Sequence, residues 1–170
     1  MNKLIRSHDR MIIAGAVFLA IFHFVTRSHA QVFGTGQHTV TVQVSSVTAV
    51  RVTSGTVSLN ITNANAVAGQ DLMTVTDQGT QLLWGVNASQ RKISVQSSLA
   101  APKYTLRLVA INPTRGTAAP EVTLNATARD FLLNIGRSSG TCTLRYTGSA
   151  LASQGTGTDV HVITFTVQTQ

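Results

Sequence analysis

The chain has 170 residues, with 13 lysines and arginines against 6 aspartates and glutamates, and 43% of its residues are hydrophobic. This composition excludes a disordered polar chain and is typical of one globular domain. Cys142 is the only cysteine, so an intramolecular disulfide is excluded, and the residue is expected to be a small buried hydrophobe.

The first 30 residues have the pattern of a secretory signal peptide. Basic residues stand at the start, residues 11–25 are mostly apolar, and small residues occupy the −3 and −1 positions before Gln31. The apolar run is shorter than the about 20 residues that a membrane span needs. We therefore expect a signal helix at 1–30 that is cleaved, with no stable membrane span afterwards. The mature protein would be secreted to the periplasm, cell surface or medium; an uncleaved anchor is the alternative.

Without this leader the chain keeps nine basic and five acidic residues, a net charge of +4. The basic residues are scattered along the chain, so a nucleic-acid partner is not expected. Residues 31–37 include two glycines and predict a flexible lead-in. We expect a single domain over 38–170, because a chain of this size buries one hydrophobic core.

Apolar and polar residues alternate with period two through 38–170, with turn residues between the runs. Such alternation gives each strand one buried and one solvated face. The pattern predicts an all-β fold, an antiparallel immunoglobulin-like β-sandwich of about 7–10 strands. Turns are expected at 53–55, 77–79, 112–116, 136–140 and 153–159. The expected inward residues are Val40, Val42, Val44; Val57, Leu59, Ile61; Leu82, Trp84, Val86; Ile93, Val95; Tyr104, Leu106, Leu108; Val122, Leu124, Ala126; Phe131, Leu133, Ile135; Cys142, Leu144, Tyr146; and Ile163, Phe165, Val167.

The first alternating run, residues 38–44, is a candidate assembly strand through Val40, Val42 and Val44. Main-chain hydrogen bonds are available to such a strand in its own sheet and at an exposed edge of a neighbouring molecule. Two alternatives follow. The strand completes its own sheet, which is the default because the effective concentration is high within one chain, or it is donated to another copy.

The last forty residues carry a resemblance in FLLNIGRSSG at 131–140, TLRYT at 143–147 and VITFTV at 162–167. Together they resemble the closing strands of secreted bacterial β-sandwich surface proteins of unassigned function, which are similar in outline to pilin-like domains. The resemblance covers 131–170 and implies a fold and export rather than an activity. The cysteine pair and the terminal aromatic signature of chaperone-usher pilins are absent.

Few residues of the mature chain can titrate or attack a substrate. Asp159 and His161 lie two residues apart and would need a nearby serine to form a triad, but no Gly-x-Ser-x-Gly elbow accompanies them. The structural alternative is a polar pair at the rim of the sandwich. Asp71 and Asp77 are too sparse for a calcium loop. We therefore expect no enzyme, no catalytic residue, no cofactor and no metal site.

Lys92, Lys103 and Arg107 fall at outward positions of two successive predicted strands. They form a candidate basic contact stripe for acidic surface polysaccharide or lipid headgroups. The alternative is that these charges only protect strand edges against aggregation. The assigned aromatic residues share parity with the core, so a sugar-stacking platform is not expected.

The sequence thus predicts a secreted, non-catalytic structural or interaction protein of the bacterial cell surface or extracellular matrix, with a pilus-like component as one form. Its expected partners are other proteins or copies of itself, with surface polysaccharide as a further option. An extracellular glycan- or protein-binding module is the alternative. A small hydrolase that uses Asp159 and His161 is less favoured.

Overall fold

The structure is a computed structural model that describes residues 37–170. The expected signal helix at 1–30 and almost all of the lead-in lie outside the described residues. By its contacts the chain divides into a unit up to Val42 and a unit Gln43–Gln170, which carries every strand of the described part. No helix among the described residues is long and apolar enough to cross a membrane.

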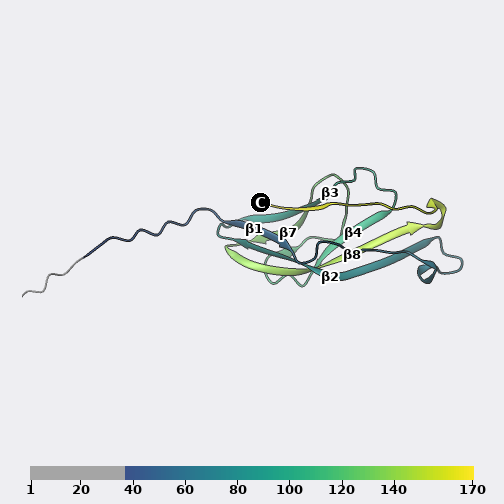
Figure 1. Cartoon of the computed structure of the whole chain (residues 1–170), viewed down its shortest axis with the longest axis horizontal. Helices are drawn as coiled ribbons and strands as arrows, with labels where there is room; N and C mark the ends of the chain where they lie inside the picture. The colour runs from purple at the N-terminus through teal and green to yellow at the C-terminus, as the bar shows by residue number, and fades with distance from the viewer. Residues whose placement is uncertain (1–36) are drawn as a thin grey trace, which may run out of the picture. The chain divides into compact units, whose positions relative to one another are not determined.

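Nine strands and two short 3-10 helices make up the described fold, and the strands form two antiparallel sheets (Figure 1). The expected all-β fold is therefore confirmed. The first sheet, in spatial order, contains β1 (Thr48–Val52), β2 (Leu72–Val86), β8 (Ser138–Leu151), β4 (Thr105–Ile111) and β6 (Val122–Thr123). The second contains β5 (Thr117–Ala118), β7 (Arg129–Ile135), β3 (Arg91–Ser97) and β9 (Ile163–Thr169). The helices are η1 (Asn63–Asn65) and η2 (Ala152–Gln154).

The core lies between the two sheets, as in a β-sandwich. The first sheet contributes Leu82 and Trp84, and the second contributes Phe131. Trp84 is 3% exposed and Cys142 is 2% exposed, which confirms that both side chains point inward. The aromatic and aliphatic residues at the inward positions of the strands therefore pack against one another between the sheets. The hydrophobic effect stabilises this packing because it removes apolar surface from water.

The expected turn at 77–79 is wrong, because β2 runs through it as one continuous strand of 15 residues. The register with β8 shifts between Asp77 and Thr80, so two residues of β2 face one residue of β8 in a β-bulge. The bulge changes the parity of the strand. Val75 before it and Leu82 after it consequently turn toward the same side, although they are seven positions apart and would face opposite sides in a regular strand.

Three other predicted runs do not form strands as expected, at 38–44, 57–61 and 124–126. Alternation indicates which side chains are apolar, but a strand also needs a neighbour that bonds its backbone. In β7, register shifts against β3 bury Leu132 completely, whereas the expected inward residue, Leu133, is only half-buried. Parity was therefore misassigned where the ladder is irregular.

The two ends of the sandwich differ because the long strands of the first sheet outrun the second sheet (Figure 1). Strands β2 and β8 have 15 and 14 residues, whereas β3, β7 and β9 have 7 each. Where β2 and β8 extend furthest, their inner face is covered by residues 56–61 and 155–162, which form no strand. We call this the open end, and the end around Trp84 the closed end.

Candidate functional site: a groove at the open end

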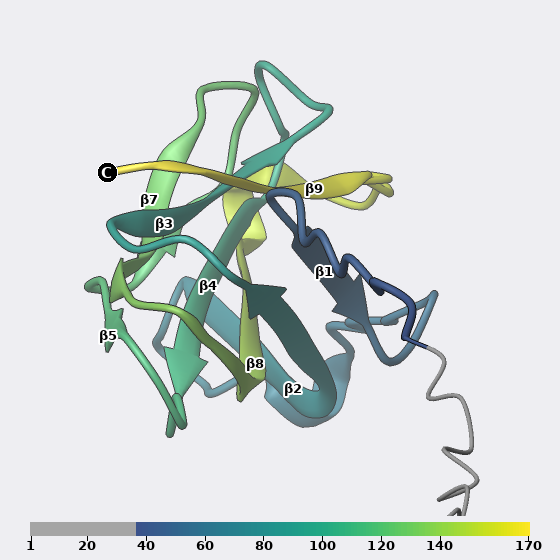
Figure 2. The same ribbon diagram turned by 90° about the vertical axis from the view of Figure 1, so that its left-hand side faces the viewer.

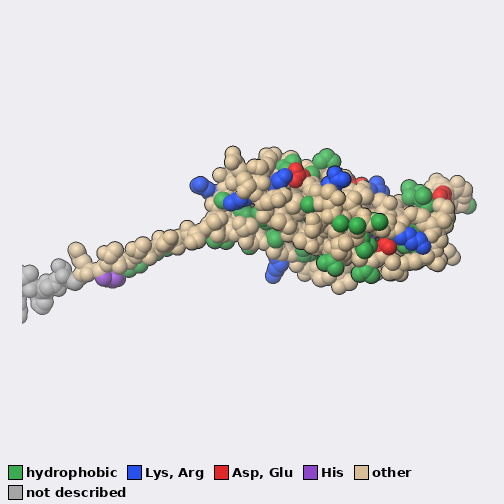
Figure 3. All heavy atoms as spheres, turned by 90° about the horizontal axis from the view of Figure 1, so that it is seen from above, with side chains coloured by type: hydrophobic (Ala, Val, Ile, Leu, Met, Phe, Trp, Pro, Cys, Tyr) green, Lys and Arg blue, Asp and Glu red, His purple; other side chains and the backbone are tan. Residues whose placement is uncertain are grey.

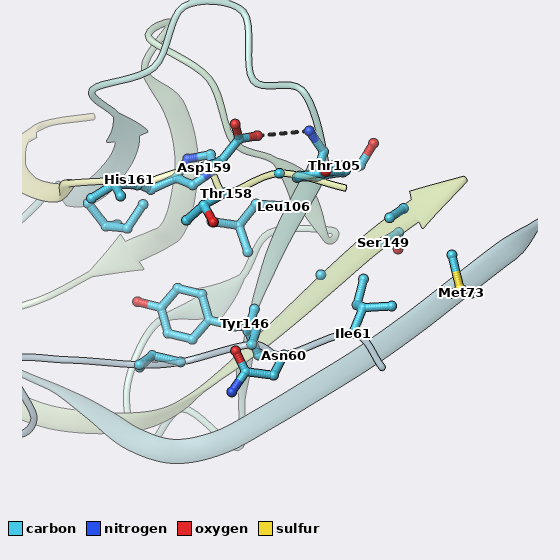
Figure 4. A pocket seen from close by; sticks show the side chains of 18 of the residues that line it. Asn60, Ile61, Met73, Thr105, Leu106, Tyr146, Ser149, Thr158, Asp159 and His161 are labelled. Atoms are coloured by element: carbon cyan, nitrogen blue, oxygen red, sulfur yellow. Dashed lines mark hydrogen bonds between the residues drawn. The ribbon is translucent and has the colours of Figure 1, made fainter. Parts of the chain in front are cut away.

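A groove of about 1330 Å³ lies at the open end of the sandwich. Its floor is the inner face of β4 and β8, including Leu106, Tyr146 and Gly148. Two segments form its walls, which we call the 56–61 wall and the 155–162 wall (Figure 4). The first residues of β9 continue the second wall, so the groove runs alongside the beginning of that strand.

Hydrogen bonds to the residues just before β4 fix the position of the 155–162 wall. Each bond joins this wall, or the residue before it, to Lys103 or Tyr104, and the one to Asp159 is drawn in Figure 4. The amine of Lys103 donates one of these bonds, so it holds the wall in place. The bonds run from Tyr104 OH to Gly155 O (2.8 Å), from Tyr104 N–H to Asp159 Oδ2 (2.8 Å), from Lys103 Nζ to Thr156 O (2.8 Å) and from Gln154 Nε2 to Lys103 O (2.7 Å).

The 56–61 wall is held by side-chain packing instead. Val57 and Leu59 pack against the core, and Leu59 lies over Gly148, where an added Cβ would approach its Cδ1 to 3.3 Å. No hydrogen bond reaches a backbone N–H or C=O of residues 57–61 within the described part of the chain. Residues 57–61 are half-buried or exposed, so these N–H and C=O groups bond water in place of a protein partner and are accessible to a bound chain.

His161 contacts a serine, the condition that would favour a hydrolase. Ser97 Oγ lies 2.8 Å from His161 Nδ1, and Ser97 Oγ also accepts the N–H of Leu99 at 3.2 Å. A hydroxyl can donate one hydrogen bond and accept two, so the direction of the bond between Ser97 and His161 depends on which nitrogen of the imidazole carries the proton. Burial lowers the pKa of His161 from its ordinary value of 6.5, while Asp159 opposes the shift, so the net effect favours the neutral ring.

This pair lacks the other features of a catalytic triad. Ser97 is 2% exposed, so a substrate has no access to its hydroxyl. The Oδ2 atom of Asp159 accepts the N–H of Tyr104, and no hydrogen bond joins Asp159 to the imidazole of His161. A triad needs the carboxylate to orient the imidazole and the serine to face the substrate. The arrangement therefore favours the structural interpretation of these residues at the beginning of β9.

The structure does not bring Lys92, Lys103 and Arg107 together in a stripe. Lys92 belongs to β3 in the second sheet and pairs with Asp130 at 2.8 Å, whereas Arg107 belongs to β4 in the first sheet and pairs with Glu121 at 3.4 Å. Consecutive strands of different sheets point their outward residues to opposite faces of a sandwich. Figure 3 shows Lys and Arg side chains at separate places on the visible face.

The candidate assembly strand lies upstream of the first sheet. The side chains of Val40, Val42 and Val44 are 71%, 83% and 74% exposed, and none of these residues is in a strand. Directly afterwards Asn87 holds residues 45–47 in place. Its Oδ1 accepts the N–H of Val47 at 2.7 Å, and its Nδ2 donates to the carbonyl oxygen of Ser45, also at 2.7 Å. We call this contact the Asn87 clamp.

Two tyrosines that the sequence assigned to the core, Tyr104 and Tyr146, also line the groove. Burial, with a smaller contribution from the charge of Asp77, raises the pKa of Tyr146 to about 12, so its hydroxyl stays protonated. Residues 37–170 contain no cluster of three or more acidic, histidine or cysteine side chains able to hold a metal ion. Asp71 bonds Ser153 before β2 begins, so it does not share a loop with Asp77.

No protein-family model matches the chain, and no curated protein sequence matches it. The function is therefore inferred from the geometry of the chain itself.

Proposed function

We propose that this chain is a secreted, non-catalytic structural or interaction protein of the bacterial cell surface or extracellular matrix, which associates with copies of itself in a pilus-like manner. An immunoglobulin-like arrangement of the sandwich is part of the proposal. The observation that carries it is the exposure of Val40, Val42 and Val44. Export rests on the signal-peptide pattern of the first 30 residues.

Three exposed valines at alternate positions form an apolar stripe on any strand that this segment adopts. Fully burying one such side chain stabilises an interface by about 1.5–3 kcal/mol before the cost of ordering the segment. The Asn87 clamp fixes residues 45–47, so the free segment begins immediately upstream of a defined point. A short apolar segment that is attached to the domain at a fixed position is suited to bind as an additional strand at the sheet edge of another molecule.

Two variants of the mature chain, residues 31–170, test this association. Val42→Asp places a charge on the valine face, and the matched control Thr41→Asp places the same charge one residue away on the other face, since successive side chains alternate. Sedimentation velocity across a concentration series should show association of the unmodified chain and of Thr41→Asp, and loss of association for Val42→Asp. Equal behaviour of both variants, or a monomeric unmodified chain at every concentration, contradicts the proposal.

Export is tested separately by mass spectrometry of the protein recovered from fractionated cells and medium. The expected amino terminus is Gln31, in free or cyclised form, because small residues precede it at −3 and −1. An intact Met1 in the recovered protein contradicts a cleaved signal peptide.

The groove supports a second candidate, an extracellular glycan-binding module. Tyr104 and Tyr146 both line it, and aromatic rings in a cleft are a common platform for sugars. A screen of the mature protein against bacterial surface oligosaccharides tests this. Binding that Tyr104→Ala abolishes but Tyr104→Phe retains favours this candidate over self-association, because the phenylalanine keeps the ring and loses only the bond to Gly155.

A further inference from the structure

The beginning of β9 is a sheet edge whose backbone has a partner on one side only. Strand β9 pairs with β3 and has no second neighbour in its sheet among residues 37–170. The N–H of Ser98 donates to the carbonyl oxygen of Val162, and antiparallel pairs alternate between bonded and non-bonded positions. Ile163 and Phe165 therefore turn their backbone N–H and C=O groups away from β3. Both residues line the groove.

The opposite side of the groove also lacks backbone partners. Residues 57–61 receive and make no backbone hydrogen bond in the described chain, although their side chains pack on the same floor as the 155–162 wall. The groove is therefore bordered on both sides by unbonded backbone and floored by the other sheet. A sheet from which one strand is missing has this arrangement.

We propose that the groove is a vacant strand position of the second sheet, and that its occupant is the segment 38–44 of a second copy of this chain. The inference rests on the proposed self-association and names the surface that accepts the strand. Bound there, the segment adds hydrogen bonds to Ile163 and Phe165 on one side and to residues 57–61 on the other.

The chemistry of the segment matches the groove. Its three valines would face the floor formed by Leu106, Tyr146 and Gly148, while the threonines and Gln43 face outward. Among the described residues, no Lys, Arg or Glu lines the groove, and the one carboxylate there, Asp159, already accepts the N–H of Tyr104. An uncharged segment therefore enters without leaving a buried charge unpaired.

The segment also resembles the strand beside which it would bind. Residues 39–44 read TVTVQV and residues 164–169 read TFTVQT, identical at four of six positions. The second of these sequences forms most of β9 and packs Phe165 and Val167 against the core. A segment with nearly the same pattern is thus suited to continue the same sheet by one strand.

The size of the groove and the nature of the other edges point to the same acceptor. A volume of about 1330 Å³ exceeds the roughly 300–1,000 Å³ of small-molecule pockets and suits an extended chain. The other edge strands are less open to pairing, because β5 and β6 have two residues each and β1 carries Arg51. Short or charged edges resist strand addition, whereas β9 has seven residues and no charge.

The reach of the chain selects a second copy as the donor. The Asn87 clamp lies at the closed end, next to the last residue of β2, whereas the groove extends past Val75. Asn87 and Val75 are twelve positions apart, about 35–40 Å at the rise of a strand. The seven residues 38–44 span at most about 25 Å. Tied at the clamp, the segment falls short of much of its own groove, but not of the groove of another molecule.

A mixed cross-linking experiment on full mature chains tests the acceptor. One protein carries Thr41→Cys, on the outward face of the segment, and the other carries Val160→Cys, on the 155–162 wall, where the side chain is 74% exposed. Cys142 is buried and does not interfere. After mixing and treatment with a short thiol cross-linker, the expected product is a covalent dimer. Thr123→Cys on the exposed edge strand β6 replaces Val160→Cys in the matched control.

We expect roughly tenfold more dimer with Val160→Cys than with Thr123→Cys, because docking raises the local concentration of the two thiols only at the groove. Association that Val42→Asp abolishes, together with equal cross-linking at both positions, overturns the groove as the acceptor and leaves the proposed self-association intact. Association that Val42→Asp leaves unchanged overturns both. A third protein carries both Thr41→Cys and Val160→Cys in one chain. An intramolecular cross-link in this protein at high dilution would show that the occupant is the chain's own segment, and would overturn the inference.

Discussion

The closed and open ends of the sandwich share the strands β2 and β8 but differ in what covers them. At the closed end the second sheet covers these strands, and Leu82, Trp84 and Val86 are 0%, 3% and 7% exposed. At the open end Leu72 and Leu151 are 51% and 40% exposed, and segments without strand structure form the cover. Figure 2, viewed from the closed end, shows β3, β7 and β9 of the second sheet facing β2, β8 and β4 of the first. The closed end is thus covered by a paired sheet, whereas the open end is covered by segments with unpaired backbone, and it is there that we propose a strand binds.

The largest expected effect is at the closed end. Trp84→Ala should lower the free energy of unfolding by about 3–5 kcal/mol, because it leaves a large cavity in a packed core. At the open end, Leu59→Ala should cost about 1–2 kcal/mol, since Leu59 is only half-buried. Urea titrations of both variants measure the difference. Equal losses would show that the two ends contribute alike to stability.

A pair of glycines sharpens the comparison within the closed end. The Trp84 ring lies directly over Gly140, its partner across β2 and β8, so a Cβ at that position would overlap the indole. Gly140→Ala should therefore cost about 1–3 kcal/mol through overpacking. Gly85 has nothing within 4 Å of an added Cβ, and Gly85→Ala should stay within about 0.5 kcal/mol. Thermal unfolding of the two variants would contradict this packing if their losses were similar.

The contact between Ser97 and His161, where β9 begins, should give a smaller change. Ser97→Ala removes the hydrogen bond to the imidazole and the one from the N–H of Leu99, and should cost about 1–2 kcal/mol. The same variant tests the less favoured hydrolase. Hydrolysis of ester substrates by the unmodified chain that disappears in Ser97→Ala would contradict a structural role for the pair.

The pH dependence of stability follows from the lowered pKa of His161. Below pH 6.5 the unfolded chain binds a proton on this residue more readily than the folded chain does. Stability contributed by the neutral ring is therefore present above pH 6.5 and declines as the pH falls toward the lower pKa of the folded state. His161→Gln should reduce this decline in chemical unfolding measured from pH 7.5 to 5. An unchanged pH profile would assign the decline to other groups.

The smallest expected change concerns Cys142. Burial raises its pKa to about 11, opposed in part by a hydrogen bond to the backbone of Leu82, so little thiolate forms near neutral pH. The native protein should resist iodoacetamide at pH 8 and react only after addition of denaturant. Rapid alkylation of the native protein would show that this part of the core opens.

The sequence predicted the closed end better than the open end. Alternation identified Leu82, Trp84 and Cys142 as inward residues, because a regular ladder preserves parity along each strand. It missed the bulge at 77–79, where Asp and Gly are equally typical of a turn. It also could not reveal the groove, since Val57, Leu59 and Ile61 alternate as a strand does. Whether such a run finds a backbone partner depends on strands distant in sequence.

Amide hydrogen exchange of the mature chain tests the vacant strand position most directly. The measurement is made on the Val42→Asp variant, whose own segment should no longer enter a groove because of the added charge. It compares this variant with and without an added peptide of residues 38–44. We expect the peptide to slow exchange at residues 57–61 and at Ile163 and Phe165, because their amides gain hydrogen-bond partners. Exchange elsewhere should change little. Unchanged exchange at both walls with saturating peptide, or slowing confined to another edge, would contradict the assignment of the groove.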